Sequence, residues 1–461
     1  MTNRVAALII GGGISGLVCA YALRKAGVDA LCVEMSDRAG GVIRSERLDG
    51  YLLELGPQSF SGTAQMLQLF DELGIREQVV QAPAGAPRYV LIDGKLQKVP
   101  MSPPAFLASG FVGLGTKFAL LRDAIGTSAP PDDDESIANF VRRKFSAQML
   151  DRLVGPFVSG VYAGDPEKLS LRSAFPMLHD AEKRKGSVIR GMISKAKERK
   201  PDQPRQRPTL LSFCEGNRTF PDALAAKLGD RLHLNAVVRS VVSEISGSTP
   251  AFLVAIQTAT GQESITADHL ILATQTNIAA TLVRDIDPTI SDRLAEIEFA
   301  PIAVVSLGYP KSEIGNSLDG FGFLVPRSAG VRTLGAVWNS SLFPNRAPDG
   351  HALVTSFIGG ATDPNAIQLR PDELATIVHK EISPLLKIRS AAPVFSNVSI
   401  YQRALPQYNL GHSARLSAID EARKSRPHLH LIGNYLRGPA IGSCVEQALD
   451  AADQIIRLQN R

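Results

Sequence analysis

The sequence predicts an α/β fold with a parallel sheet at its centre, and three observations support this prediction. An apolar run at residues 5–10 leads directly into glycines, and a helical pattern follows as far as Gly27. A second apolar run at residues 29–33 ends at an acidic residue, Glu34. Two later apolar runs lie at residues 268–274 and 428–434. Continuous apolar runs of this length are typical of strands that are buried on both faces of a sheet.

The first glycine-rich turn predicts a dinucleotide site. Residues 11–16 read Gly-Gly-Gly-Ile-Ser-Gly and lie between the first strand and the first helix. Gly11 permits the tight turn, Gly13 lets a pyrophosphate approach the backbone, and Gly16 lets helix and strand pack closely. The helix N-terminus attracts the phosphate charge. Glu34 follows the second strand, where it can accept hydrogen bonds from ribose hydroxyls.

The residues after Glu34 decide between FAD and NAD. Residues 36–44 place a double glycine, Gly40-Gly41, between Arg38 and Arg44. This resembles the extended motif of the glutathione-reductase-type FAD fold. The alternative is a plain Gly-Gly turn that contacts no cofactor. The runs at 268–274 and 428–434 resemble later strands of that fold, and residues 441–448 begin a last helix. Its N-terminus could stabilise negative charge on reduced flavin. We therefore expect an FAD domain built from the beginning, middle and end of the chain.

Composition and charge restrict the class of protein. The chain has 461 residues, of which 44% are hydrophobic, so it can form two or three domains with sizeable cores. The net charge is +5, but residues 183–207 alone carry +8, which leaves −3 for the rest. This pattern excludes a general nucleic-acid role. The basic segment is either a solvated loop or a surface for anionic lipid.

The four cysteines indicate a reducing compartment. Cys19, Cys32, Cys214 and Cys444 form no CxxC pair, and the histidines show no metal-binding spacing. The first residues do not form a secretion signal. We therefore expect a cytoplasmic protein without a metal.

Several strings resemble one family, the protoporphyrinogen and coproporphyrinogen oxidases, within the larger group of amine-oxidase-like flavoproteins. The most specific string is Pro-Phe-Val-Ser-Gly-Val-Tyr-Ala-Gly-Asp-Pro at residues 156–166. The other matching strings lie at residues 53–60, 301–310, 320–326, 340–348 and 433–446. The resemblance therefore spans nearly the whole chain.

The resemblance implies an oxidoreductase of heme biosynthesis that acts on CH–CH groups. A porphyrinogen, either protoporphyrinogen IX or coproporphyrinogen III, would lose six electrons and become the flat porphyrin. The flavin N5 would take the hydride, with no catalytic side chain assigned, and O2 would reoxidise the flavin and give H2O2. Arg88 resembles the position that pairs with a propionate. Leu324, Val337 and Phe357 resemble positions that sandwich the rings, and Gln58 a polar position near the substrate.

The cofactor site that this resemblance implies includes the glycine turn, the loop after Glu34, the string around Gly56 and the C-terminal strings. Its predicted members are Gly11, Gly13, Ile14, Ser15, Gly16, Glu34, Met35, Arg38, Gly40, Gly41, Val42, Gly56, Pro57, Gln58, Ser59, Val238, Gly433, Asn434, Ala440, Ile441, Gly442 and Val445. The chain departs from the family pattern at Gln58, Val337 and Trp338, and in the loop that contains Asn217 and Arg218.

We expect three domains and several partners. The FAD domain takes residues 1–85, 208–280 and 400–461; the α+β substrate domain takes 86–100 and 281–399; a helical insertion takes 101–207. The insertion is expected to dock on the cytoplasmic face of a membrane, unless it is a soluble helical subdomain. The other partners implied are a porphyrinogen, O2, ferrochelatase or another heme-pathway enzyme, and a second copy of the chain. Two alternatives are an amine or polyene oxidase and a non-catalytic flavoprotein that binds tetrapyrroles.

Overall fold

The first sheet brings together strands from three distant parts of the chain. The computed structural model describes residues 3–198, 209–246 and 249–459. The strand order is β10-β2-β1-β13-β12-β11, and β19 pairs with β13. The strands are β1 (Asn3–Ile10), β2 (Ala30–Val33), β10 (Leu232–His233), β11 (Val237–Ser246), β12 (Thr249–Thr258), β13 (Gly261–Leu272) and β19 (Leu429–Leu431).

The long strand β13 organises this sheet. Its beginning pairs antiparallel with β12, its middle and end pair parallel with β1, and its last residues pair parallel with β19. Strands β2, β1, β13 and β19 of the parallel part are largely buried and apolar, as the continuous apolar runs predicted, although β13 and β19 bury His269 and His430. The predicted α/β fold with a parallel sheet at its centre is thereby confirmed.

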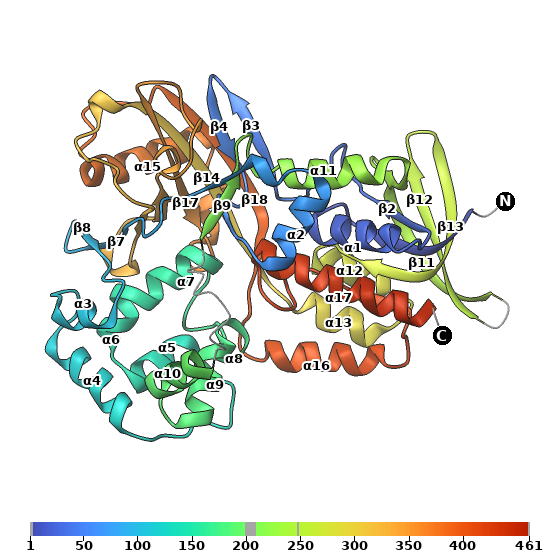
Figure 1. The fold of residues 1–461 in the computed structure, drawn as a ribbon, viewed down its shortest axis with the longest axis horizontal. Coiled ribbons are helices and arrows are strands. Elements are labelled where there is room, and N and C mark those ends of the chain that lie inside the picture. Colours follow the sequence, from blue (N-terminus) through green and yellow to red (C-terminus); the bar gives the residue numbers. More distant parts are fainter. Residues whose placement is uncertain (1–2, 199–208, 247–248, 460–461) are drawn as a thin grey trace.

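Helices cover both faces of this sheet (Figure 1). The residues of α1 (Ile14–Lys25), α2 (Ala64–Leu73), α11 (Thr219–Leu228) and α17 (Ile441–Gln459) share one apolar core. The residues of α12 (Thr276–Val283), α13 (Pro288–Ala295) and α16 (His412–Arg423) share the core on the opposite face.

A second, mixed sheet forms the upper left part of Figure 1. Its order is β18-β14-β17-β16-β15-β7-β8. These strands are β7 (Arg88–Ile92), β8 (Lys95–Lys98), β14 (Phe299–Pro310), β15 (Gly322–Leu324), β16 (Thr333–Val337), β17 (His351–Gly359) and β18 (Phe395–Pro406). Helix α15 (Pro371–Leu386) covers one face through a shared apolar core. We call the opposite face, which holds Leu324, Gly335 and Phe357, the inner face.

Short elements join the two sheets. Two small sheets pair β3 (Ser45–Leu48) with β4 (Tyr51–Glu54), and β9 (Leu210–Phe213) with β5 (Phe60–Ser61) and β6 (Val79–Gln81). Helix α14 (Asn339–Leu342) follows β16. The 3₁₀ turns lie at Arg76–Gln78, Gly229–Arg231, Lys311–Glu313, Arg327–Ala329 and Pro364–Gln368.

Residues 103–198 form a helical lobe with its own apolar core at the lower left of Figure 1. Its helices are α3 (Pro103–Ala108), α4 (Leu114–Ile125), α5 (Ile137–Lys144), α6 (Ala147–Met149), α7 (Gly155–Tyr162), α8 (Leu171–Ala174), α9 (Pro176–Lys185) and α10 (Val188–Glu198), with a π-helical turn at Leu150–Val154. In its interior Lys144 lies 2.7 Å from Asp123 and 3.2 Å from Glu182, which joins α4, α5 and α9.

Two predicted domain limits fall inside single elements. Strand β18 of the second sheet runs across position 400, and helix α12 runs across position 280. The last part of the basic segment 183–207, from residue 199 onward, lies outside the described residues. Among the helices that the structure describes, none is both long enough and apolar enough to span a lipid bilayer.

Candidate functional site

The predicted dinucleotide turn has the close packing that its glycines imply. A Cβ atom at Gly16 would lie 1.9 Å from the carbonyl oxygen of Gly11, so only glycine lets α1 approach the turn. Gly11 has φ +111° and a Cβ there would lie 2.7 Å from the carbonyl oxygen of Ala273 in the segment after β13. These two positions therefore require glycine for local packing.

Gly13 differs from its neighbours because the space beside it is open. A Cβ atom at Gly13 would meet no atom within 4 Å. Its backbone forms an isolated bridge with Gly40, so the turn and the loop after Glu34 lie side by side. The side chains of Met35 and Val42 are 65% and 41% exposed, respectively. Large apolar side chains left exposed beside an open backbone turn are expected where a ligand covers them.

Glu34 is fixed to this turn by its carboxylate. One oxygen, Oε2, accepts a hydrogen bond from the backbone N–H of Gly12 at 2.6 Å. The other, Oε1, accepts from the backbone and the hydroxyl of Ser36 at 2.9 and 2.7 Å. A carboxylate oxygen has two lone pairs, so Oε2 retains acceptor capacity for a ribose hydroxyl. The turn, its open side and this acid together fit the adenosine and pyrophosphate parts of FAD.

The double-glycine loop is held by its own arginine. Arg38 donates to the carbonyl of Gly41 at 2.8 Å and to that of Ala39 at 3.3 Å. Gly40 and Gly41 have φ values of +104° and +57°, which a side chain would strain. Gly56 packs against the same loop, because a Cβ there would lie 2.0 Å from the carbonyl oxygen of Val42.

The C-terminal members of the predicted cofactor site lie on one connection and one helix. Gly433 and Asn434 follow β19, and Ile441, Gly442 and Val445 are buried in the first turns of α17. Ala440, just before that helix, is exposed. Ile14 and Ser15 are buried at the start of α1, and Val238 is half-buried on β11.

A buried polar network joins the FAD domain to the second sheet. Glu54 at the end of β4 forms an ion pair with Arg346 at 2.9 Å, and both side chains are 1% exposed. The same carboxylate accepts from the backbone N–H of Asn217 and from the hydroxyl of Ser45. Asn217 donates from its side chain to the carbonyl of Pro57 at 2.7 Å. The loop at residues 56–59 is thus tied from several sides.

Gln58 continues this network into the second sheet. Its amide nitrogen donates to the carbonyls of Glu54 and Gly56, which uses both of its hydrogens. Its amide oxygen accepts from Asn339 at 2.7 Å, and Asn339 lies just after β16. Gln58 is 8% exposed. The side chain therefore connects the loop to the end of β16, and its role toward a substrate stays a prediction.

The inner face has a glycine, Gly335, between two large side chains, and we call this place without a side chain the gap. The Leu324 side chain leans toward it, because a Cβ atom at Gly335 would lie 3.2 Å from Cδ2 of Leu324. In the register, Leu324 of β15 lies opposite Gly335 of β16, and Gly335 lies opposite Phe357 of β17. Paired residues point to the same face of a sheet, so Leu324 and Phe357 flank a position with no side chain. Val337 lies two residues beyond Gly335 and shares this face. Three residues predicted to contact rings therefore lie together around the gap.

Arg88 lies in the next row of the same face. It is paired with Gly322 of β15, which in turn is paired with Val337. Its guanidinium carbon is 5.5 Å from the centre of the Phe321 ring, and the side chain is exposed. Among the described residues, no carboxylate lies within salt-bridge distance of it. Arg88 can therefore meet an anionic group of a ligand that occupies the gap.

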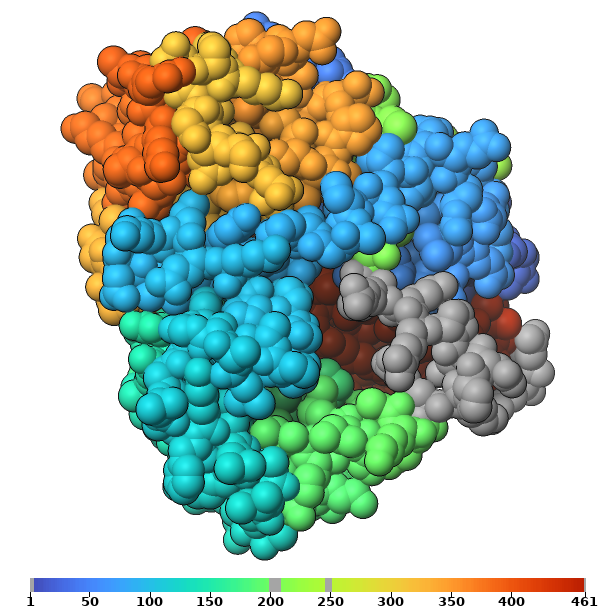
Figure 2. All heavy atoms as spheres, turned by 60° about the vertical axis from the view of Figure 1, so that its left-hand side comes forward, coloured from blue at the N-terminus to red at the C-terminus, as the bar shows by residue number. Residues whose placement is uncertain are grey.

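Helix α7, which holds the most specific family string, packs over this face. A Cβ atom at Gly160 would lie 2.4 Å from Cδ2 of Leu324. Phe157 and Val161 of the same helix are 44% and 41% exposed. Figure 2 shows the surface hollowed between the helical lobe and the N-terminal segments, with atoms of the C-terminal end of the chain at the bottom. Helix α7 thus packs directly against the inner face at Leu324.

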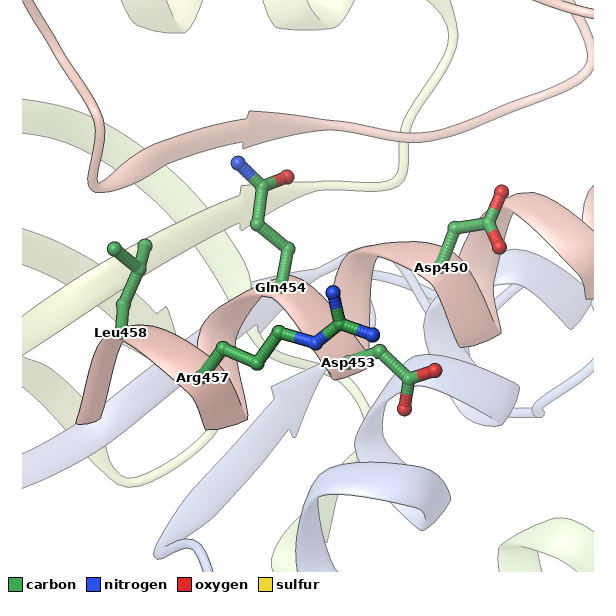
Figure 3. A pocket seen from close by; sticks show the side chains of 5 residues that line it. All are labelled: Asp450, Asp453, Gln454, Arg457 and Leu458. Carbon is green, nitrogen blue, oxygen red and sulfur yellow. The ribbon is translucent and has the colours of Figure 1, made fainter. Parts of the chain in front are cut away.

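A separate hollow lies along the far half of α17 (Figure 3). It has a volume of about 390 Å³ and is lined by Asp450, Asp453, Gln454, Arg457 and Leu458. At about 1.5 Å per residue, its first lining residue is roughly 14 Å along the helix from Ile441. Its lining is mostly charged, and it is not part of the predicted flavin site.

Three residues of this region could not be assigned from the sequence. Gly335 forms the gap, Asn339 holds Gln58, and Asn217 holds Pro57. Only Asn217 gave a signal, because it departs from the family pattern. Gly335 and Asn339 act through partners that lie elsewhere in the chain, which no local pattern reports.

Comparison with known proteins agrees with this geometry. The family described as flavin containing amine oxidoreductase matches residues 14–456. The chloroplastic protoporphyrinogen oxidase of Nicotiana tabacum is 34% identical over 98% of this chain and 86% of its own length. The coproporphyrinogen III oxidase of Bacillus subtilis is 28% identical over 97% of each chain.

A solved structure from Exiguobacterium sp. 255-15, provisionally described as a protoporphyrinogen oxidase, has the same fold. It superimposes with a TM-score of 0.80 at 22% sequence identity, and the match covers 100% of both chains. The flavin turn, the double-glycine loop and the second sheet described above therefore belong to a known architecture.

Proposed function

The chain belongs to the family of flavin-containing amine oxidoreductases, and we propose that it oxidises a porphyrinogen to the porphyrin with FAD as its cofactor. The observation that supports this function best is that Leu324, Val337 and Phe357 lie together on the inner face, around Gly335. An apolar face with the exposed cation Arg88 at its edge suits a tetrapyrrole with a propionate. Relatives named protoporphyrinogen oxidase and coproporphyrinogen III oxidase support the same substrate class.

FAD, when bound, supplies a two-electron acceptor that takes a hydride at N5. The chain's own residues bind the substrate and orient it. Leu324, Val337 and Phe357 hold the faces of the macrocycle, and Arg88 fixes one propionate. Each of three two-electron oxidations would remove a hydride from a methylene bridge carbon and release one proton. Two of the three protons would come from pyrrole N–H groups and one from the remaining bridge CH2, so that four CH bridges, two N–H groups and a loss of six electrons result. Three O2 molecules would accept these electrons and form three H2O2.

Anaerobic mixing tests the function directly. Purified holoenzyme should lose its flavin absorbance when a porphyrinogen is added, and porphyrin fluorescence should appear. In air, porphyrin and peroxide should form together. Benzylamine and a polyamine serve as rival substrates. Flavin reduction by an amine but by neither porphyrinogen would contradict the proposal, and so would a porphyrinogen that binds without reducing the flavin.

We also propose that the helical lobe attaches the protein to the cytoplasmic face of a membrane. Four large apolar residues of α4, Leu114, Phe118, Leu121 and Ile125, are each between 57% and 82% exposed. Their spacing of four, three and four residues places them on one face of the helix. The buried residues of α4 are Thr116, Ala119 and Asp123 instead. A helix that presents its apolar stripe outward is typical of a helix lying in a lipid interface.

Flotation with anionic liposomes tests this attachment. The wild type should float with the vesicles at low salt, and a variant with Phe118→Ser and Leu121→Ser should remain at the bottom. Val394→Asp is a matched control, because Val394 is 59% exposed but lies before β18, outside the lobe. A wild type that stays wholly unbound would refute the proposal. O2 as acceptor, ferrochelatase or another heme-pathway enzyme as partner, and a homodimer stay predictions.

A further inference from the structure

We call residues 433–438, which follow β19 and where FAD is predicted to bind, the flavin loop. The connection between β18 and α16, together with the first residue of α16, contacts this loop through two buried side chains. The hydroxyl of Tyr408 donates to the carbonyl of Asn434 at 2.5 Å. The Nε2 atom of His412 lies 3.0 Å from the carbonyl oxygen of Tyr435, the next residue. Tyr408 and His412 are 2% and 1% exposed. Two consecutive carbonyls after β19 are therefore held by two side chains from another segment.

The two rings form one rigid unit. Their centres are 4.4 Å apart and their planes differ by 9°. Because a carbonyl can only accept, His412 must carry its hydrogen on Nε2, and Nδ1 is buried without a protein partner. Burial lowers the pKa of His412 to about 4, so the ring is neutral at physiological pH. A neutral stacked pair of this kind fixes both the direction and the length of the contacts to the carbonyls of Asn434 and Tyr435.

The opposite side of the same connection is bonded to the helical lobe. The backbone N–H of Ser170 donates to the carbonyl of Tyr408 at 2.8 Å, and that of Leu410 donates to Lys168 at 2.9 Å. The backbone N–H of Gly411 donates to Asp134 at 2.8 Å. Asp134 also accepts from the hydroxyl of Ser170 at 2.6 Å. The connection thus lies between the lobe that α7 belongs to and the loop after β19.

We propose that Tyr408 and His412 are positioning residues for the flavin, which fix the Asn434–Tyr435 backbone relative to the helical lobe. This inference rests on the proposed placement of FAD at Gly433 and Asn434, and not on the identity of the substrate. The two side chains do not touch reacting atoms. They fix the position of the Asn434–Tyr435 backbone, which is predicted to lie next to the cofactor. The helical lobe is hydrogen-bonded to the opposite side of the same β18–α16 connection.

Tyr408→Phe tests the inference with the least change in shape, since only the hydroxyl is lost. The hydroxyl bonds both the Asn434 carbonyl and the backbone of Gly438. Each hydrogen bond contributes about 0.5–1.5 kcal/mol, so the dissociation constant of FAD should rise at least roughly two- to twelvefold. The visible absorption band of the FAD that remains bound should shift. In the apoprotein, amide hydrogen exchange at residues 434–438 should become faster. His412→Leu should give the same changes, and His412→Gln, whose amide can donate as Nε2 does, should restore them.

Tyr309→Phe is the matched control. Tyr309 is also fully buried, and its hydroxyl lies 2.9 Å from Nδ1 of His379 on α15, far from the flavin loop in the sequence and in the fold. The Tyr309→Phe variant should leave the FAD affinity and the FAD absorption band unchanged. Equal FAD affinity and equal exchange in the two tyrosine variants would overturn the inference. Faster exchange with unchanged FAD affinity would also overturn it, because the loop would then not position the flavin. A wild type inactive toward porphyrinogens would refute the proposed function alone.

Discussion

Replacing Arg88 by alanine is the sharpest test of how a substrate is held. Arg88 begins β7, is paired with Gly322, and lies over Phe321 at the edge of the gap around Gly335. A fully exposed ion pair contributes about 0.2–1 kcal/mol. A hydrogen bond to a charged group contributes about 1.5–3 kcal/mol. A macrocycle in the gap would partly cover Arg88, so we expect a loss of roughly 1.4–2 kcal/mol, or about 10- to 30-fold in kcat/KM.

The assay must separate binding from chemistry. We expect KM for a porphyrinogen to rise, while kcat and the absorption spectrum of bound FAD stay close to those of the wild type. Arg88→Lys should recover only part of the loss, because lysine keeps the charge but not the planar fork. Lys98→Ala is the matched control, since Lys98 is paired with Tyr89 and so points to the opposite face. An unchanged kcat/KM for both porphyrinogens in Arg88→Ala would show that no propionate binds there.

Further predictions concern the cofactor, the slot and the histidines. Gly13→Ala and its control Gly110→Ala should both fold with an unchanged Tm, because a Cβ atom meets no other atom within 4 Å at either position. In a dialysis measurement, Gly13→Ala should lose FAD and Gly110→Ala should retain it. Phe357→Leu should lower kcat/KM roughly two- to twelvefold in steady-state turnover, as the loss of an aromatic contact of about 0.5–1.5 kcal/mol implies, without releasing FAD. Burial lowers the pKa of His269 to about 4 and of His430 to about 3, from an ordinary 6.5, so the unfolded chain takes up protons that the folded chain does not. Stability should therefore fall as the pH falls below about 6.5, by roughly 2 kcal/mol per histidine at pH 5. Urea midpoints of wild type and His269→Gln at pH 7 and pH 5 should show a smaller loss in the variant.

The flavin turn could be predicted because its parts are close in sequence and physically restricted. Gly11, Gly16 and Glu34 all lie within the first strand–helix–strand unit, and each contact in that unit requires a particular residue type. The gap at Gly335 could not be predicted in the same way. It depends on the register of β15, β16 and β17, and a shift of one residue would turn Leu324 and Phe357 to the other face.

In the helical lobe, the periodic apolar pattern predicted helices but not which apolar side chains are buried. Helices of six residues and longer do lie there. Phe111 and Val112 are 3% and 2% exposed, whereas Leu114 and Phe118 are 82% and 69% exposed. All four are apolar, but Phe111 and Val112 pack against Val90 and Ile92 of β7, whereas α4 packs against α5 and α10 with Leu114 and Phe118 turned outward. Orientation is a property of the tertiary structure, and the membrane proposal depends on it.

The charge of the inner face also bears on which porphyrinogen is preferred. Strands β7, β14, β15, β16 and β17 contain one arginine or lysine in total, Arg88. Coproporphyrinogen has propionates where protoporphyrinogen has two vinyl groups, and a buried carboxylate without a partner is costly. Lys95 of the edge strand β8 is paired with Ile92 and is a further cation on this face. Because the five inner strands carry one cation, we predict that the substrate with fewer carboxylates is preferred and that kcat/KM is higher for protoporphyrinogen than for coproporphyrinogen. Arg88→Ala should lower both values by a similar factor. A higher value for coproporphyrinogen, together with a smaller loss in Arg88→Ala, would mean that cations outside these five strands bind its extra propionates.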